Sequence, residues 1–193
     1  MSIAEKRQIE VDKYDYIYGL KRPYTINKIR LDQAVHGMQA VLQASPDAKT
    51  LLDVGCGDGA WIKHLEKAFN LECRGVEPVA SQANDKVITG LATDLPFPDN
   101  SFDIVSCLDV MEHLVPEDSI PALQEIARVS RGGCLITISN TKSVHRGLND
   151  SELHVNRRPF DEWIAMLEQV FHNVEMLENF QNLPGNRAFA LVV

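Results

Sequence analysis

The stretch LLDVGCGDGAWIKHL, Leu51 to Leu65, constrains the fold of this chain more than any other. An apolar run ends in an aspartate, three glycines follow at alternate positions, and a segment with helical spacing of apolar residues begins. Glycine permits a tight turn and lets the backbone approach a ligand closely. The start of the next helix adds unpaired backbone N–H groups. The stretch therefore predicts a strand, a ligand-binding turn and a helix in direct succession.

Segments typical of strands and helices alternate from Thr50 onward. This alternation predicts a doubly wound, Rossmann-like α/β fold, in which a mostly parallel sheet carries helices on both faces. We expect seven strands, with an antiparallel final strand. The expected strands are 51–54, 72–76, 87–91, 102–108, 134–139, 174–177 and 189–193, with a turn at 131–133 and an amphipathic helix over 160–171.

The chain of 193 residues is long enough to bury a core as one compact unit. Apolar residues recur at helical spacing from Ile26, and a break follows at Ser45-Pro46-Asp47. We therefore expect residues 1–45 to form an N-terminal helical segment and residues 46–193 to form the main domain.

Composition excludes some classes of partner and indicates a compartment. The net charge of -8 argues against a general binder of nucleic acid or membrane surfaces, because both attract basic proteins. The four cysteines, Cys56, Cys73, Cys107 and Cys134, form no CxxC pair and are expected to be buried free thiols. Neither a signal core nor an apolar run of membrane-spanning length is present. We expect a cytoplasmic protein.

The glycine turn satisfies two fingerprints. Gly55-x-Gly57-x-x-Ala60 passes as a dinucleotide-binding motif. Asp53-x-Gly55-x-Gly57-x-Gly59 resembles the acidic residue and GxGxG of class I S-adenosylmethionine-dependent methyltransferases. A carboxylate before the turn suits the ammonium of S-adenosylmethionine better than a pyrophosphate. An acidic residue about 20 positions further on, here Glu77, accepts hydrogen bonds from ribose hydroxyls in both cofactor classes.

The segment GLATDLPFPDNSFDIVSCLDVMEHL, residues 90–114, resembles the corresponding block of these methyltransferases. The resemblance implies that an aspartate and the apolar residue after it, here Asp94 and Leu95, contact the adenine. It also implies that the fourth strand delivers acidic residues and a histidine to the pocket floor, and that the N-terminal segment, residues 1–45, is a lid over the cofactor. The cofactor-binding residues that we expect are Asp53, Gly55, Cys56, Gly57, Gly59, Glu77, Asp94, Leu95, Leu108 and Asp109.

Methyl transfer from a sulfonium is an in-line displacement, so the protein mainly aligns the reactants and excludes water. A hydroxyl or a protonated amine also needs a base. His113 and His154 are the candidates for this catalytic role. The alternative for His113 is a structural role beneath the cofactor.

A metal-assisted mechanism is a second possibility. Asp109-x-x-Glu112-His113, with His154 further on, resembles a set found in small-RNA 3′-end methyltransferases and in some ubiquinone-pathway O-methyltransferases. That resemblance implies a divalent metal, such as zinc, manganese or iron, that holds vicinal hydroxyls and lowers their pKa. Asp109 departs from the usual glutamate and has a shorter reach.

The acceptor is expected to be a small anionic molecule. Arg146, Arg157 and Arg158 follow the fifth strand and are suited to clamp a carboxylate or phosphate, unless nearby acids neutralise them. Tyr18 and Arg22 of the N-terminal segment are further candidates. We therefore expect O-methylation of an acidic, phosphorylated or phosphonate-like metabolite. The alternatives are metal-assisted methylation of vicinal hydroxyls, in a catechol-like molecule or at an RNA 3′ end, and non-catalytic binding of S-adenosylmethionine.

Overall fold

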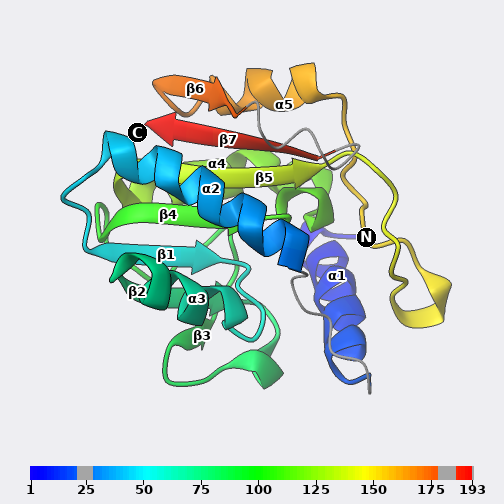
Figure 1. The fold of residues 1–193 in the computed structure, drawn as a ribbon. Coiled ribbons are helices and arrows are strands. Elements are labelled where there is room, and N and C mark those ends of the chain that lie inside the picture. Colours follow the sequence, from blue (N-terminus) through cyan, green and yellow to red (C-terminus); the bar gives the residue numbers. More distant parts are fainter. Residues whose placement is uncertain (21–27, 178–185, 193) are drawn as a thin grey trace.

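The computed structural model describes residues 1–20, 28–177 and 186–192. Figure 1 shows a sheet flanked by helices, with seven strands in the order β3-β2-β1-β4-β5-β7-β6. The strands are β1 (Thr50–Val54), β2 (Glu72–Glu77), β3 (Val87–Thr89), β4 (Phe102–Leu108), β5 (Ser130–Ser139), β6 (Asn173–Met176) and β7 (Asn186–Val192). The α-helices are α1 (Ile3–Tyr18), α2 (Lys28–Ala44), α3 (Ala60–Phe69), α4 (Ser119–Val129) and α5 (Phe160–Leu167). Short 3₁₀ turns are η1 (Ala80–Gln82), η2 (Met111–His113), η3 (Pro116–Asp118) and η4 (Leu148–Asp150).

The sheet confirms the predicted fold class. Strands β1 to β5 pair in parallel, while β7 runs antiparallel to both β5 and β6. The strand order reverses at β1, which pairs with β2 on one side and β4 on the other. In open α/β sheets, ligands bind beyond the carboxyl ends of the strands at such a reversal. The turn that follows β1 lies at this position.

Two apolar clusters, one on each face of the sheet, form the core. On one face, Leu123 and Ile126 of α4 and Trp163 of α5 pack with buried residues of β4 and β5. On the other, Met38 of α2 and Ile62 of α3 pack with buried residues of β1 and β2. The central strands β1, β4 and β5 are buried on both faces and therefore read as continuous apolar runs. Helix α2 packs against β5 and β7, and a domain division at residue 45 stays a prediction.

Helix α1 differs from the other helices in having little apolar surface in the core. It begins with a capping box, in which Ser2 and Glu5 bond each other's backbone N–H, and Ile17 is its buried residue. In Figure 1 it stands beside the sheet edge to which β1 and β4 point. A lid role for this helix stays a prediction. In the part of the chain that the structure describes, no helix combines the length and apolar character needed to cross a membrane.

Several element boundaries differ from the sequence-based expectation. Residues 131–133 lie within β5 and do not form a turn. A Cβ at Gly133 would lie 2.8 Å from Val41 Cγ1, so this glycine permits α2 to pack closely on the strand. The helix expected over 160–171 ends at Leu167, although Phe171 remains buried beyond it. The third strand ends at Thr89, two residues before the expected boundary.

Candidate active site

A cavity of about 320 Å³ lies where the parallel strands end. Its wall includes residues that directly follow each of β1 to β5, together with one face of α1. The five strands deliver side chains from distant parts of the sequence to one place, because the carboxyl ends of parallel strands share one edge of the sheet. Figure 1 shows α1 at this same edge.

The turn after β1 requires its glycines. Gly55, Gly57 and Gly59 have φ angles of +74°, +54° and +76°, a left-handed conformation that side chains disfavour. The N–H groups of Gly55 and Cys56 donate to the carbonyl of Val76 in β2, at 2.7 and 3.2 Å. Gly55, Cys56 and Gly57 line the cavity, while Gly59 is the N-cap of α3.

Asp53, in β1, places a buried carboxylate on the cavity wall. Its Oδ1 accepts a hydrogen bond of 2.6 Å from the hydroxyl of Ser106 in β4. Burial raises the pKa of Asp53 to about 7, and the charge of Glu77 contributes in the same direction. A cationic ligand bound beside this carboxylate would therefore favour its ionised form.

Glu77 is a second buried carboxylate, at the end of β2. The backbone N–H of Gly57 donates to its Oε2 at 3.0 Å, which ties the glycine turn to β2. Burial raises the pKa of Glu77 to about 7. A carboxylate at this position is suited to accept hydrogen bonds from ribose hydroxyls.

Asp94 and Leu95, the residues expected to contact the adenine, are not part of the described cavity wall. Gly90, Leu91, Ala92 and Thr93 line the cavity instead. Asp94 is exposed. Leu95 is 3% exposed and packs in the core, with its N–H donating to Glu125 Oε2 at 2.8 Å. The segment that touches the cavity is therefore the four residues before the predicted pair.

Asp109 follows β4 and is held in a strained conformation. Its φ of 54° lies in the left-handed region, which is uncommon for a non-glycine residue. Its N–H donates to the carbonyl oxygen and Oγ1 of Thr137 at 3.0 and 2.9 Å. The Thr137 hydroxyl lies 2.9 Å from Asp109 Oδ1 and donates to it. Asp109 and the preceding Leu108 both line the cavity, as expected for cofactor contacts.

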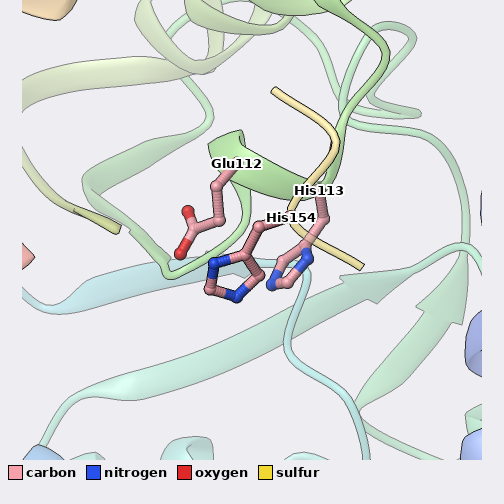
Figure 2. Close-up of side chains that lie close together, drawn as sticks. All are labelled: Glu112, His113 and His154. Carbon is pink, nitrogen blue, oxygen red and sulfur yellow. The ribbon is translucent and has the colours of Figure 1, made fainter. Parts of the chain in front are cut away.

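Figure 2 shows Glu112, His113 and His154 gathered together, although His154 lies 41 positions after His113 (154 − 113). One possible ligand atom from each lies within 4.8 Å of the others, and all three residues are buried. The imidazole centroids are 4.7 Å apart in an edge-to-face arrangement. Both histidines line the cavity. Asp109, the fourth residue of the predicted metal set, is not a member of this group among the described residues.

Backbone carbonyls orient both imidazoles. His113 Nδ1 lies 3.0 Å from the carbonyl oxygen of Leu153 and 2.6 Å from the hydroxyl of Tyr14 in α1. His154 Nδ1 lies 2.6 Å from the carbonyl oxygen of Thr141. A carbonyl can only accept, so a neutral imidazole whose Nδ1 donates to that carbonyl carries its lone pair on Nε2. Such a nitrogen can take a proton or bind a metal.

The predicted arginine clamp is not on the described wall of the cavity. Arg146 forms an ion pair of 2.8 Å with Glu152. Arg158 donates to Asn156 Oδ1 at 2.8 Å, and Arg157 is exposed. Arg22 lies outside the described residues, whereas Tyr18 does line the cavity. The basic side chains of the described wall are Arg7, Lys142, His113, His145 and His154.

Helix α1 supplies wall residues that the sequence analysis overlooked. Arg7, Glu10, Val11 and Tyr14 line the cavity together with Tyr18. Their spacing of three or four residues places them on one helical face, which is the signal that would have found them. Polar contacts hold the helix in place: Arg7 donates two hydrogen bonds of 2.6 Å to the buried carboxylate of Asp118.

Residues 52–138, from β1 through most of β5, match the family described as the methyltransferase domain. The matched segment, which is less than half of the chain, is similar to a methyltransferase domain. A crystal structure of the Burkholderia thailandensis 1,6-didemethyltoxoflavin-N1-methyltransferase, with bound 1,6-didemethyltoxoflavin and S-adenosylhomocysteine, has a TM-score of 0.69 to it. The likeness covers 100% of this chain and 89% of that one at 13% identity, and therefore shows the methyltransferase fold.

Curated relatives of the methyltransferase domain differ in the atom that they methylate. Ajmaline N-methyltransferase of Rauvolfia serpentina is 32% identical over 120 residues, which cover 54% of this chain and 39% of that protein. A probable chloroplastic tocopherol O-methyltransferase of Oryza sativa subsp. japonica is 32% identical over 123 residues, which cover 56% of this chain and 33% of that protein. The chain thus spans less than half the length of these two relatives.

Proposed function

We propose that the chain transfers the methyl group of S-adenosylmethionine to a small-molecule acceptor. The observation that carries this proposal is a single cavity that joins the glycine turn and two buried carboxylates to a pair of imidazoles. The match to the methyltransferase domain supports it. Asp53 is suited to the ammonium of the methyl donor, Glu77 to its ribose, and residues 90–93 to its adenine.

The chemistry asks for alignment and for exclusion of water. A lone pair of the acceptor attacks the methyl carbon while the carbon–sulfur bond breaks, and the sulfur keeps the bonding electrons. The proton of a hydroxyl or ammonium acceptor passes to a base, for which His113 and His154 on the cavity wall are the candidates. Helix α1 covers this edge of the sheet and contributes to a water-poor site.

We propose an oxygen acceptor with a nearby anionic group. The arginines expected to bind that group lie outside the described wall, whereas Lys142 and His145 are part of it. Lys142→Ala is then expected to raise the KM of the acceptor more than that of S-adenosylmethionine. Lys67→Ala is the matched control, because Lys67 is exposed on α3 and is not part of the described wall. Equal effects of the two variants would exclude this assignment.

Calorimetric titration with S-adenosylmethionine and with NAD tests the cofactor class. We expect saturable binding of S-adenosylmethionine alone. Incubation with a panel of small hydroxylated and amine acceptors, with release of S-adenosylhomocysteine as the readout, then tests turnover. Binding without release of product with any acceptor would support a non-catalytic binding protein, and binding of NAD alone would overturn the proposal.

A second candidate acceptor carries two vicinal hydroxyls, as in a catechol-like molecule or an RNA 3′ end. The close pair of imidazoles on the cavity wall favours it, because two adjacent oxygens can engage two adjacent ring nitrogens. The net charge of -8 favours the small molecule over RNA. Turnover of a catechol but not of the matched monophenol would support this candidate, and equal turnover would exclude it.

A further inference from the structure

We propose that Glu112, His113 and His154 bind one divalent transition-metal ion that faces the cavity. The inference rests on the proposed function only in that the ion would hold the acceptor; binding of the ion can be tested separately. The residues come from η2 and from the segment before α5, and Figure 2 shows their side chains directed toward one another.

The distances suit a single ion. Nitrogen and oxygen ligands lie about 2.0–2.2 Å from a metal such as zinc, so two ligands of one ion are separated by about 3–4 Å. The three ligand atoms already lie within 4.8 Å of one another. Small rotations of the side chains would close the remaining gap. Two imidazoles with one carboxylate are also a set that transition metals accept.

Hydrogen bonds outside the group fix the direction of each ligand. The carbonyl oxygens of Leu153 and Thr141 lie 3.0 and 2.6 Å from the Nδ1 atoms, and a neutral imidazole that donates there carries its lone pair on Nε2. The N–H of Ser139 donates to Glu112 Oε1 at 3.1 Å and fixes that carboxylate. Metal-ligating histidines commonly donate their second N–H to a carbonyl or carboxylate, which orients the ring.

Asp109 is excluded from the ligand set. Its Oδ1 accepts a hydrogen bond from the Thr137 hydroxyl, and its backbone N–H donates to Thr137 Oγ1. Its carboxylate is not part of the three-residue group. Three protein ligands leave coordination positions open, as in catalytic metal sites and unlike closed structural ones. Because His113 and His154 line the cavity, open positions would face an acceptor. A metal there would lower the pKa of a bound hydroxyl and hold a neighbouring oxygen.

Tyr14 links this site to the lid. Its hydroxyl lies 2.6 Å from His113 Nδ1, and its ring meets the imidazole edge at a centroid distance of 5.1 Å. Tyr14 is therefore a positioning residue that acts through His113. Helix α1 would restrain a metal ligand when it closes over the cavity.

Titration of chelator-treated, dialysed full chain with Zn²⁺ and with Co²⁺ tests the site. We expect one equivalent of metal to bind, with visible absorption of Co²⁺ that reports imidazole ligation. Glu112→Gln and, separately, His154→Ala should weaken binding by more than about tenfold. His172→Ala is the matched control, because His172 is exposed and lies outside the group.

Three outcomes decide the matter. Stoichiometric binding that is lost in both ligand variants and kept in His172→Ala supports the site. Absence of stoichiometric binding by the wild-type chain, or equal binding in all variants, overturns it. Circular dichroism and titration with S-adenosylmethionine are measured on every variant, so that an unfolded protein is recognised. Cofactor binding by the metal-free chain also tests the proposed function independently of the metal.

A substitution of Tyr14 tests its positioning role. Tyr14→Phe keeps the aromatic packing and removes the hydroxyl that lies 2.6 Å from His113 Nδ1. The absorption spectrum of the Co²⁺ complex should shift, and the Kd for metal should rise. An unchanged spectrum and an unchanged Kd would separate Tyr14 from the metal site.

Discussion

At the residue scale, the first two glycines of the turn have different structural demands. A Cβ on Gly55 would overlap the side chain of Val110, whereas a Cβ on Gly57 would lie 3.3 Å from the hydroxyl of Tyr18. Both residues have positive φ, so an added side chain strains the backbone in either place. Gly55 is therefore required for packing and conformation, while Gly57 is required mainly for conformation and for ligand approach.

Alanine substitutions should separate these demands. Gly55→Ala is expected to lower the free energy of unfolding by about 1–3 kcal/mol, because a clash adds to the strain. Gly57→Ala should cost about 1 kcal/mol and still abolish binding of S-adenosylmethionine. Urea denaturation and calorimetric titration measure the two quantities. Equal destabilisation with intact binding in Gly57→Ala would contradict the assignment of this turn to the cofactor.

The paired carboxylates make a prediction about pH. Asp53 and Glu77 both have a pKa of about 7 in the folded chain. They are largely protonated at pH 6 and largely ionised at pH 8. The affinity for the cationic cofactor should therefore rise between pH 6 and pH 8. Calorimetry across this range measures the change, and Asp53→Asn should flatten the profile.

The same groups affect the stability of the ligand-free chain with a defined sign. Unfolded carboxyls lose their protons near pH 4, whereas the folded chain keeps these two up to about pH 7. The folded state binds more protons in this window, so their contribution to the free energy of unfolding falls as pH rises. The stability of wild type relative to Asp53→Asn should fall from pH 4 to pH 7. A constant difference in urea denaturation would show that Asp53 is already ionised.

The sequence was most informative about residues that act through their backbone and about residues whose side-chain direction is fixed by a strand. Gly55, Gly57, Asp53 and Glu77 line the cavity because the ends of two adjacent strands place them there. Asp94 and Leu95 lie in a loop whose path depends on core packing, and a pattern of residue types does not determine that path. The pairing of Arg146 with Glu152 is likewise a matter of loop conformation.

At the scale of elements, α1 is held to the domain by polar contacts more than by apolar burial. Asp118 is 3% exposed, and Arg7 donates two hydrogen bonds to its carboxylate. An arginine fork on a buried carboxylate gives a directional attachment. The side chains of the neighbouring Lys6–Glu117 ion pair are 39% and 41% exposed, so solvent screens the attraction between them.

Removal of the Arg7 fork should loosen the helix. Arg7→Gln is expected to increase hydrogen exchange of residues 3–18 and to speed dissociation of S-adenosylmethionine, because the lid opens more often. Lys6→Gln is the matched control and should change neither quantity appreciably. Hydrogen exchange followed by mass spectrometry and stopped-flow displacement measure the two effects. Equal exchange in both variants would show that Arg7 does not fasten the lid.

Element boundaries were less predictable than element order. The alternation of strands and helices follows from apolar periodicity, and the structure confirms it. Gly132 and Gly133 resemble a turn in sequence, yet they lie in β5 where α2 approaches closely. The end of α5 at Leu167 is set by packing of the residues after it, since Phe171 is buried outside the helix. Tertiary contacts of this kind have no local signature.

At the scale of the whole molecule, cofactor binding should stabilise the entire fold. A ligand at 100 times its Kd that binds only the folded state adds about 2.7 kcal/mol. For a domain of this size the melting temperature should then rise by about 5–10 °C. Differential scanning calorimetry with S-adenosylmethionine measures the shift, and NAD at the same concentration should leave the melting temperature unchanged.

The position of β7 between β5 and β6 has a consequence for synthesis on the ribosome. β6 leaves the exit tunnel before β7, yet β7 is the strand that joins it to the sheet. Until β7 emerges, β5 has an open edge and β6 has no place to pair. The five strands of the parallel part of the sheet, β1 to β5, all leave the exit tunnel before β6. The nascent chain can therefore order its glycine turn before its last strands, and the β5 edge stays open to pairing with other chains in the interval.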